Sequence, residues 1–383
     1  ARAAMLIRLD RPREARSDYD RALRLLGDGP YPTERGVALG GRGVAWAMED
    51  AYPQAIADLG AARVHFDDAG DALAVARLDG NLGTLEVNRG RPAYGLPFLG
   101  RAVDALATMG AVNELATVLA SRTSAHLDLL QYRAARADSD RGWALMARLE
   151  DPGQRAGVVL SRAEVMRATG HLREAGRLLS MADARLAFAS DRGRLPWLQA
   201  ELALDRGAAA DALRLAGQAL AEWPPDRAPG KRAWLLETRQ RAALAAGVRE
   251  SGGAGAGAGA LAGDLVPGRL VQAMRLQAAG QTAAAETAYA GALALAERGG
   301  VPSEIAAAAK PYTRWLLDQG RPAPAAAVLA RLGPWVEADF ELAALQARSA
   351  HALGQSARFH AARAHAEALA GERSLPERLP PAR

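Results

Sequence analysis

The sequence predicts an all-α fold, an α-solenoid of antiparallel helical hairpins, on three observations. Small residues recur 40 residues apart through the first half of the chain; in four of these five repeats a large residue follows at +4, and in all five another small residue follows at +7. An earlier apolar segment and a short turn precede each of these triplets. Spacings of three and four place side chains on one face of a helix. Two helices per repeat must stack on their neighbours to bury that face.

The second helix of each predicted hairpin carries the triplet. In PREARSDYDRAL (12–23) the small residues let a neighbouring helix approach, and the large residue fills the space beside it. The triplets of the first five repeats are Ala15, Tyr19 and Ala22; Ala55, Leu59 and Ala62; Gly95, Leu99 and Ala102; Ala135, Ser139 and Gly142; and Ala175, Leu179 and Ala182. The pattern returns at Ala212, Ala216 and Ala219; at Ala285, Tyr289 and Ala292; and at Ala325, Leu329 and Leu332.

The first helix of a hairpin is illustrated by VALGGRGVAWAM (37–48), which the turn EDAYP (49–53) follows. The register slips after Ala175, and the interval from Ala212 to Ala285 leaves room for one degenerate repeat. RAWLLETRQRAALAAG (232–247) predicts the first helix of that repeat. ESGGAGAGAGALAG (250–263) predicts a flexible loop or a poor helix, because each glycine costs about 1 kcal/mol inside a helix.

The predicted organisation has four segments and eight or nine hairpins. Residues 1–222 form an N-terminal array of five to six repeats. Residues 223–263 form a connector with the degenerate repeat and the Gly/Ala-rich segment, since WPPDRAPG (223–230) is rich in turn-forming residues. Residues 264–371 form a C-terminal array of two to three repeats, and residues 372–383 are expected to be a disordered tail.

The segment RGVAWAMEDAYPQAIADLGAA (42–62) resembles the tetratricopeptide repeat (TPR) pattern. Its residues at the family's small and large positions are Gly43, Trp46, Ala55, Leu59 and Ala62. NLGTLEVNRGRPAYGLPFLGRA (81–102) is similar, with Gly95 in place of an alanine and Glu86 in place of an aromatic residue. The long period resembles the variant found in bacterial regulators and CHAT-type protease proteins. The resemblance covers residues 1–222 well and 264–367 fairly, and it implies a right-handed superhelix that serves as a binding scaffold.

A charge pair is predicted inside the repeat. In repeats one, two and four an arginine lies 13 residues before the first small residue of the triplet, and an aspartate lies three after it. The predicted pairs between the two helices of a hairpin are Arg2 with Asp18, Arg42 with Asp58, and Arg122 with Asp138. Repeat three has Leu82 and Phe98 at these positions, and in repeat five Arg162 faces Leu178. The alternative is a local pair with Arg21 or Arg141, three residues after the aspartate.

The resemblance also implies where a partner would bind, because first helices line the concave groove of tetratricopeptide arrays. The groove candidates are Val44, Met48, Arg77, Thr84, Asn88, Ser124, Asp128, Glu164, Arg167, Trp197, Glu201, Met274 and Arg314. Trp197 is the strongest single candidate because tryptophan is enriched at binding hot spots. It could instead fill the kink before the degenerate repeat. The lysine-rich carboxylate clamp of some family members is missing.

Composition excludes several classes. The chain has no cysteine, so disulfides, thiolate metal sites and a cysteine nucleophile are excluded. Its net charge is +5, but acids and bases are interspersed and no basic run occurs, which disfavours nucleic-acid binding. The sequence contains no apolar run of 18 residues, so no membrane-spanning helix is predicted. No signal peptide is visible, so a cytoplasmic, bacterial protein is expected. The chain begins at Ala1, and we expect a fragment of a longer protein.

No catalytic, cofactor or metal motif is found. GAGAGALAG (255–263) partly matches a dinucleotide-binding pattern but follows no strand. The six histidines lack metal-ligand spacing. Ser121 and Ser124 lie near His126, but nothing in the sequence orients that histidine as a base.

We therefore expect a non-enzymatic scaffold that binds a peptide or protein segment in its groove, without a cofactor. The alternative is a regulatory or sensor solenoid that packs against an adjoining effector domain, such as a kinase, a CHAT-type protease or a transcription factor.

Overall fold

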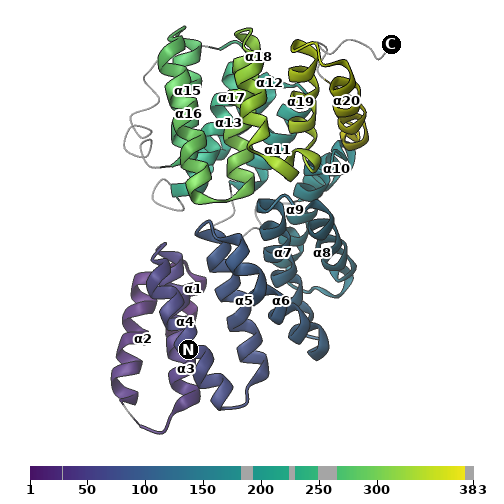
Figure 1. Ribbon diagram of the computed structural model, residues 1–383. Helices are drawn as coiled ribbons and strands as arrows, with labels where there is room; N and C mark the ends of the chain where they lie inside the picture. Colours follow the sequence, from purple (N-terminus) through teal and green to yellow (C-terminus); the bar gives the residue numbers. More distant parts are fainter. Residues whose placement is uncertain (28, 183–192, 224–228, 249–264, 376–383) are drawn as a thin grey trace. The chain divides into compact units, whose positions relative to one another are not determined.

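The computed structural model describes residues 1–27, 29–182, 193–223, 229–248 and 265–375. Within these ranges the chain forms α-helices joined by short turns and 3-10 segments, and no strand occurs (Figure 1). The predicted all-α fold is therefore confirmed. The chain divides into two compact units. Unit 1 contains residues 1–126 and 134–161, and unit 2 contains residues 127–133 and 162–182 together with the described residues from 193 onward.

Helices α1 to α9 alternate as first and second members of hairpins. Their bounds are α1 Arg2–Arg8, α2 Pro12–Leu26, α3 Pro32–Met48, α4 Tyr52–Asp68, α5 Ala72–Asn88, α6 Pro92–Met109, α7 Val112–Asp128, α8 Tyr132–Ala144 and α9 Pro152–Ala168. In unit 1, α3 packs against α4 and α5 against α6 as hairpins, and α2 with α3 and α4 with α5 join successive hairpins. This is the stacking in chain order that a solenoid requires.

The remaining described helices belong to unit 2. Their bounds are α10 Leu172–Met181, α11 Arg194–Asp205, α12 Ala209–Glu222, α13 Pro229–Ala245, α15 Val266–Ala278, α16 Thr282–Gly299, α17 Pro302–Asp318, α18 Pro322–Ala330, α19 Phe340–Ala352 and α20 Ser356–Ala370. A 3-10 segment, Gly333–Glu337, precedes α19. The first helices α11, α13, α15, α17 and α19 contact one another in that order, so they form one continuous layer.

Small and large residues pack as the repeat predicts. Ala55, Leu59 and Ala62 on α4 are almost completely buried. Gly83 on α5 lies against Leu99 on α6 so closely that a Cβ at residue 83 would lie 2.5 Å from the Leu99 Cγ. Helix-to-helix approach in this array is therefore set by the absence of side-chain atoms at the small positions.

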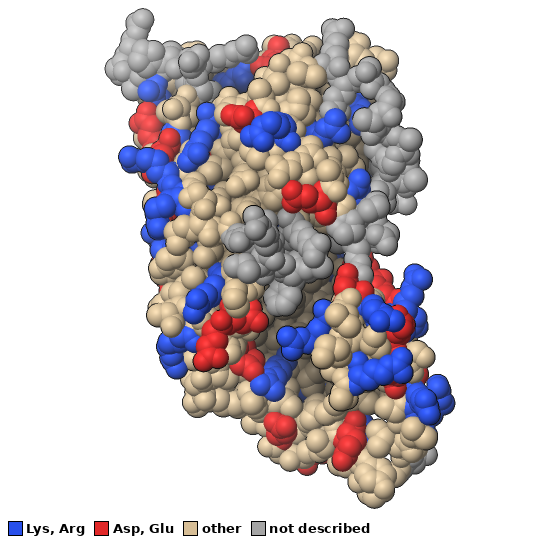
Figure 2. All heavy atoms as spheres, turned by 180° about the vertical axis from the view of Figure 1, so that it is seen from behind, with Lys and Arg blue, Asp and Glu red and all other residues tan. Residues whose placement is uncertain are grey.

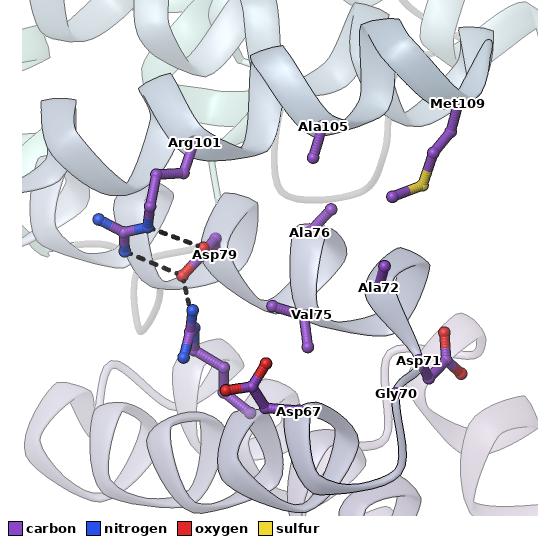
Figure 3. Close-up of a pocket in the computed structure, with 11 residues that line it drawn as sticks. Asp67, Gly70, Asp71, Ala72, Val75, Ala76, Asp79, Arg101, Ala105 and Met109 are labelled. Atoms are coloured by element: carbon purple, nitrogen blue, oxygen red, sulfur yellow. Dashed lines mark hydrogen bonds and ion pairs between the residues drawn. The ribbon is translucent and has the colours of Figure 1, made fainter.

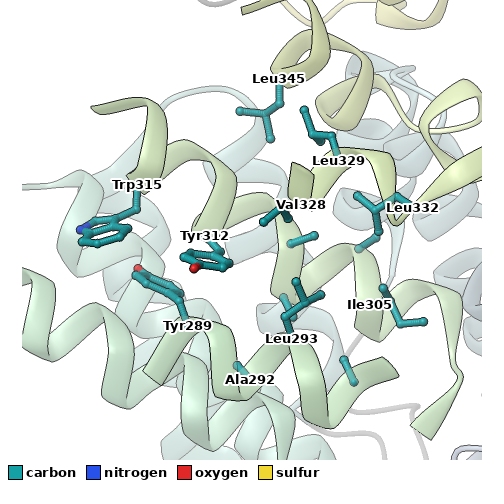
Figure 4. Packing of buried hydrophobic residues seen from close by; sticks show 14 of the residues in the cluster. Tyr289, Ala292, Leu293, Ile305, Tyr312, Trp315, Val328, Leu329, Leu332 and Leu345 are labelled. Carbon is teal, nitrogen blue, oxygen red and sulfur yellow. The ribbon is translucent and has the colours of Figure 1, made fainter. Parts of the chain in front are cut away.

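The core of the C-terminal hairpins contains most of the stacked aromatic residues. Tyr289 on α16 stacks on Tyr312 of α17 with ring centroids 5.8 Å apart, and Trp315 lies 5.9 Å from Tyr289 (Figure 4). Tyr289 occupies the large position of its triplet, between the fully buried Ala285 and Ala292. Three aromatic rings thus pack against one another in this core.

The less regular region agrees with the sequence in part. The sequence predicts the first helix of the degenerate repeat over 232–247, and α13 spans Pro229–Ala245. Helix α13 packs against both α12 and α15. The predicted boundary between residues 222 and 223 falls inside unit 2. Residues 250–263, expected to be a loop or a poor helix, lie outside the described residues.

The expectation of a disordered tail from residue 372 needs correction for its first four residues. Glu372 and Arg373 hydrogen-bond to residues before α10, and Leu375 packs against α19 and α20. A polar sequence with prolines predicted disorder, but these distant partners are not visible in the local sequence. Residues 376–383 lie outside the described residues.

Candidate peptide-binding face

Charged and polar side chains of successive first helices in unit 2 bond to one another. We call this set the inner face. Its members are Glu164 and Arg167 on α9; Trp197, Glu201 and Asp205 on α11; Glu237, Thr238 and Arg241 on α13; Lys310 and Arg314 on α17; and Glu341 on α19. Most contacts join a residue to one about one repeat further along the chain, so they link neighbouring hairpins.

Glu201 is the centre of one half of the inner face. Arg167 lies 3.4 Å from one of its carboxylate oxygens and also 2.9 Å from Asp205, one helical turn further along α11. Arg241 from α13 donates to the other oxygen of Glu201 and lies 3.0 Å from Glu237. Two arginines and three carboxylates from three helices therefore form one network.

Trp197 is oriented by a hydrogen bond. Its Nε1 donates to the Thr238 Oγ1 at 2.9 Å, and that hydroxyl donates to Glu201 at 2.7 Å. The Trp197 ring also meets Trp223 edge to face at 6.2 Å. The two interpretations of Trp197, a binding residue and a packing residue, are thus compatible, because one edge of the ring packs while the indole joins the polar network.

The other half of the inner face is centred on Lys310. Its ammonium lies 2.7 Å from Asp339, which precedes α19, and 3.7 Å from Glu341. Arg314, one turn further along α17, pairs with the same Glu341. The Tyr132 hydroxyl donates to Asp339 at 3.2 Å, so residues 127–133 also contact this network.

The charged side chains of the inner face are partly buried and partly accessible to water. The side chains of Arg241 and Glu341 keep 32% and 38% of their accessible surface. Burial is nevertheless the largest single influence on the pKa of each: it lowers that of Arg241 and raises that of Glu341, and in both cases opposite charges outweigh it. Burial raises the pKa of Glu237 to about 7. The charged side chains of the inner face are therefore partly buried, and opposite charges stabilise one another there.

An acidic group lies where residues 127–133 meet α17. Burial, together with Glu164 and Glu304, raises the pKa of Asp128 to about 7. The Ser303 hydroxyl is its described hydrogen-bond partner, at 3.5 Å. Glu164 is itself paired with Arg194 at 2.9 Å. Asp128 therefore retains a proton far more readily than an ordinary aspartate.

The thirteen groove candidates do not all come together. Seven belong to unit 2: Asp128, Glu164, Arg167, Trp197, Glu201, Met274 and Arg314. Of these, Met274 is buried in the hydrophobic core and is not available to a partner, because its side chain packs between helices. The other six lie in unit 1, where Val44 packs against a core cluster.

In unit 1, Arg77 on α5 pairs with Glu114 on α7, and the Thr84 hydroxyl donates to Ser121 at 2.9 Å. Asn88 ends α5 and is exposed, and Ser124 on α7 is half-buried. These residues also lie on first helices, and these two contacts both lie within unit 1.

The Arg–Asp positions of unit 1 are occupied by ion pairs. Asp58 receives two hydrogen bonds from Arg42, at 2.6 and 2.7 Å. Arg122 and Asp138 form the same bidentate pair, with Nε to Oδ2 at 2.6 Å. Arg2 lies 3.5 Å from Asp18 at the exposed end of the array. The alternative pair within one helix is also present in the fourth repeat, where Arg141 lies 4.0 Å from Asp138.

Sequence reasoning missed the pair in the third repeat. Asp79 on α5 is buried and is bound by Arg63 of α4 at 2.9 Å and by Arg101 of α6 at 3.0 Å (Figure 3). The three residues line one side of a cavity of about 310 Å³. In this repeat the first helix carries the aspartate and the second helix carries the arginine, which reverses the usual arrangement. Asp79 and Arg101 each lie one helical turn from the expected positions, which Leu82 and Phe98 occupy. A search for opposite charges one turn from the expected positions would have found it.

Among the described residues, no group of three or more histidine or acidic side chains could hold a metal ion. The helices that the structure describes include none long and apolar enough to cross a membrane. On the face shown in Figure 2 basic and acidic residues are interspersed.

No protein-family model matches the chain, and none of the curated proteins matches it in sequence. Among solved structures it is similar to a Rap protein complexed with competence and sporulation factor, at 13% identity over 79% of this chain and 77% of that chain, with a TM-score of 0.49. A tetratricopeptide repeat protein from Parabacteroides merdae is 15% identical over 72% of this chain and 99% of its own, with a TM-score of 0.45. The P58(IPK) TPR domain is 13% identical over 96% and 90%, with a TM-score of 0.25.

These likenesses, at TM-scores below 0.5, support no statement about function. The fold of the described residues is an array of stacked helical hairpins in which small and large residues meet at fixed positions. The finer resemblance to the long-repeat variant of CHAT-type proteins stays a prediction.

Proposed function

We propose that the protein is a non-enzymatic interaction scaffold that binds an extended protein segment on the inner face of unit 2. The observation that carries this proposal is the clustering of charges itself. Charged side chains from α9, α11 and α13, and from α17 and α19, form ion-pair networks whose members remain partly exposed to water. Apolar residues on the opposite sides of the same helices already form the core, so the fold does not require charges here.

The chemistry of the inner face suits a polypeptide. An extended segment presents backbone N–H and C=O groups and side chains of either sign. The inner face offers carboxylates, guanidiniums, a hydroxyl and an indole N–H within a few ångströms of one another. These groups are paired with each other in the free protein, so a bound peptide replaces existing ion pairs and hydrogen bonds with equivalent ones. The charged groups are therefore expected to discriminate between peptides more than they increase the affinity for any one of them.

The test uses peptides selected from a random 12-residue display library against the full chain. Their dissociation constants are measured by fluorescence anisotropy with the wild type and two variants. Arg314→Ala removes an inner-face arginine that pairs with Glu341 and is 48% exposed. Arg331→Ala is the matched control, because Arg331 pairs with Glu297 between second helices and is 52% exposed.

We expect Arg314→Ala to weaken binding at least fivefold and Arg331→Ala to change it less than twofold. Trp197→Phe, which keeps an aromatic ring but removes the indole N–H that donates to Thr238, should also weaken binding. Peptides that bind the Arg314 and Arg331 variants equally well would place the site elsewhere on the molecule.

A further inference from the structure

The two ends of unit 2 meet at residues 371–375, which we call the strap. The strap follows α20, and Figure 1 shows α20 beside α10. The backbone N–H of Glu372 donates to the carbonyl oxygen of Gly170 at 2.8 Å. Gly371 lies against Gly170 so closely that a Cβ at residue 371 would lie 2.7 Å from that oxygen. The strap is therefore seated on the segment that precedes α10.

Glu372 supplies the N-terminal cap of α10. The residue at the N-cap position, His171, makes no side-chain cap bond. The Glu372 carboxylate instead accepts from the backbone N–H of Arg173 at 2.9 Å, and Arg173 Nε lies 3.2 Å from its other oxygen. These bonds lower the pKa of Glu372. A carboxylate at a helix N-terminus satisfies a free N–H group and meets the positive end of the helix dipole.

Arg373 is held by backbone carbonyls and a ring. Its guanidinium donates to Ala168 at the end of α9 at 3.3 Å and to Leu369 and Ala370 at the end of α20 at 2.7 and 3.0 Å. It lies 4.4 Å over the Phe340 ring. A cation at helix C-termini meets the negative ends of their dipoles. The pKa of Arg373 is nevertheless lowered, chiefly by burial.

The place of the strap connects it to the inner face. Arg373 bonds to Ala168, which follows Arg167 in the chain, and lies over Phe340, which lies between Asp339 and Glu341. The strap thus adjoins the inner face at α9 and α19. Its partners there are Gly170, Arg173, Ala168 and Phe340, and they bind a glutamate followed by an arginine as they would bind a peptide.

We propose that the strap is an internal ligand, and that its seat binds a partner segment in which an acidic residue is followed by an arginine. The carboxylate of that segment caps α10 and its guanidinium lies between the end of α9 and Phe340. In the free protein the strap occupies the seat, and a partner segment displaces it. This inference extends the proposed function, because the seat continues the inner face, but its test does not depend on the library peptides.

The test uses the capped peptide LAGERSL, residues 369–375, labelled with a fluorophore. Its binding is compared between the full wild-type chain and the full chain with Glu372→Ala, Arg373→Ala and Leu375→Ala, which release the strap. Since the tethered strap competes at a high effective concentration, we expect the peptide to bind the released chain at least tenfold more tightly than the wild type. A peptide with alanine at both charged positions is the negative control.

A second comparison swaps the charges of Arg173 in the chain and Glu372 in the peptide, so that the result does not depend on how well the released chain folds. In a full chain carrying Arg173→Glu and the three strap substitutions, a peptide with Glu372→Arg should bind better than LAGERSL. Hydrogen exchange at the Arg173 amide should rise at least tenfold in the released chain, because the cap is lost. Equal binding of LAGERSL to the wild-type and released chains, or to the released chain and its Arg173→Glu version, would overturn the proposal.

Discussion

Arg42 on α3 and Asp79 on α5 carry opposite charges at nearly the same place in consecutive hairpins of unit 1. Arg42 lies between Asp20 on α2 and Asp58 on α4, and Asp79 lies between Arg63 on α4 and Arg101 on α6. Each first helix is thus joined to the second helices on both sides through one central charge. The alternation of sign gives α4 an acidic residue toward α3 and a basic one toward α5.

The two arginines around Asp79 should act redundantly. Arg63→Ala or Arg101→Ala alone leaves Asp79 with one partner, and we expect each to cost about 1 kcal/mol or less. The double variant leaves a carboxylate that is only 4% exposed without a partner, and we expect a loss of about 3–5 kcal/mol. Urea unfolding followed by circular dichroism measures all three. Additive losses would show that the arginines act separately.

Arg42 and Asp58 should differ in importance. Arg42→Ala leaves Asp58 unpaired and largely buried, so we expect about 3 kcal/mol of destabilisation. Asp58→Ala leaves Arg42 its bond to Asp20 at 2.8 Å, and we expect about 1–2 kcal/mol. Replacing both Arg42 and Asp58 by leucine should cost less than Arg42→Ala. The measurement is again urea unfolding, and equal small losses for both alanine variants would contradict a buried pair.

Helix approach at the small positions can be tested with two glycines. Gly83→Ala places a methyl group against Leu99, and we expect about 1–3 kcal/mol of destabilisation from overpacking. Gly100 lies in the next helix, α6, where an added Cβ would meet nothing within 4 Å. Gly100→Ala should therefore stabilise by about 0.5–1 kcal/mol through helix propensity. Thermal unfolding should show shifts of opposite sign.

Asp128 should make unit 2 less stable as pH rises. Its pKa is about 7 in the folded protein and 3.8 in its ordinary state. The folded state therefore keeps the proton over the range where the unfolded state has lost it, and stability falls from about pH 4 to pH 7. The groups that act on it are Glu164, Glu304 and Lys231, with Ser303 donating a hydrogen bond.

The variant Asp128→Asn removes this titration. We expect it to be about 1–2 kcal/mol more stable than the wild type at pH 8 and to lose less stability between pH 5 and pH 8. Urea midpoints at both pH values measure the difference. A pH dependence identical to that of the wild type would show that Asp128 is ionised at neutral pH.

The amino-acid sequence by itself determined the architecture. The interval of 40 residues and the alternation of small and large residues placed Ala55, Leu59 and Ala62 in the core, because helix periodicity and steric size are local properties. The same reasoning gave the positions at which Arg42 meets Asp58, since both lie at fixed offsets within one hairpin.

Only the tertiary structure decided which charges from different hairpins meet. The triad around Asp79, the network around Glu201 and the contacts of Lys310 join helices whose relative rotation no local pattern encodes. The strap is the extreme case: Glu372 caps a helix that begins 200 residues earlier in the chain. Local sequence determines which face of a helix is apolar, but only the packing of unit 2 brings residues 371–375 to the segment before α10.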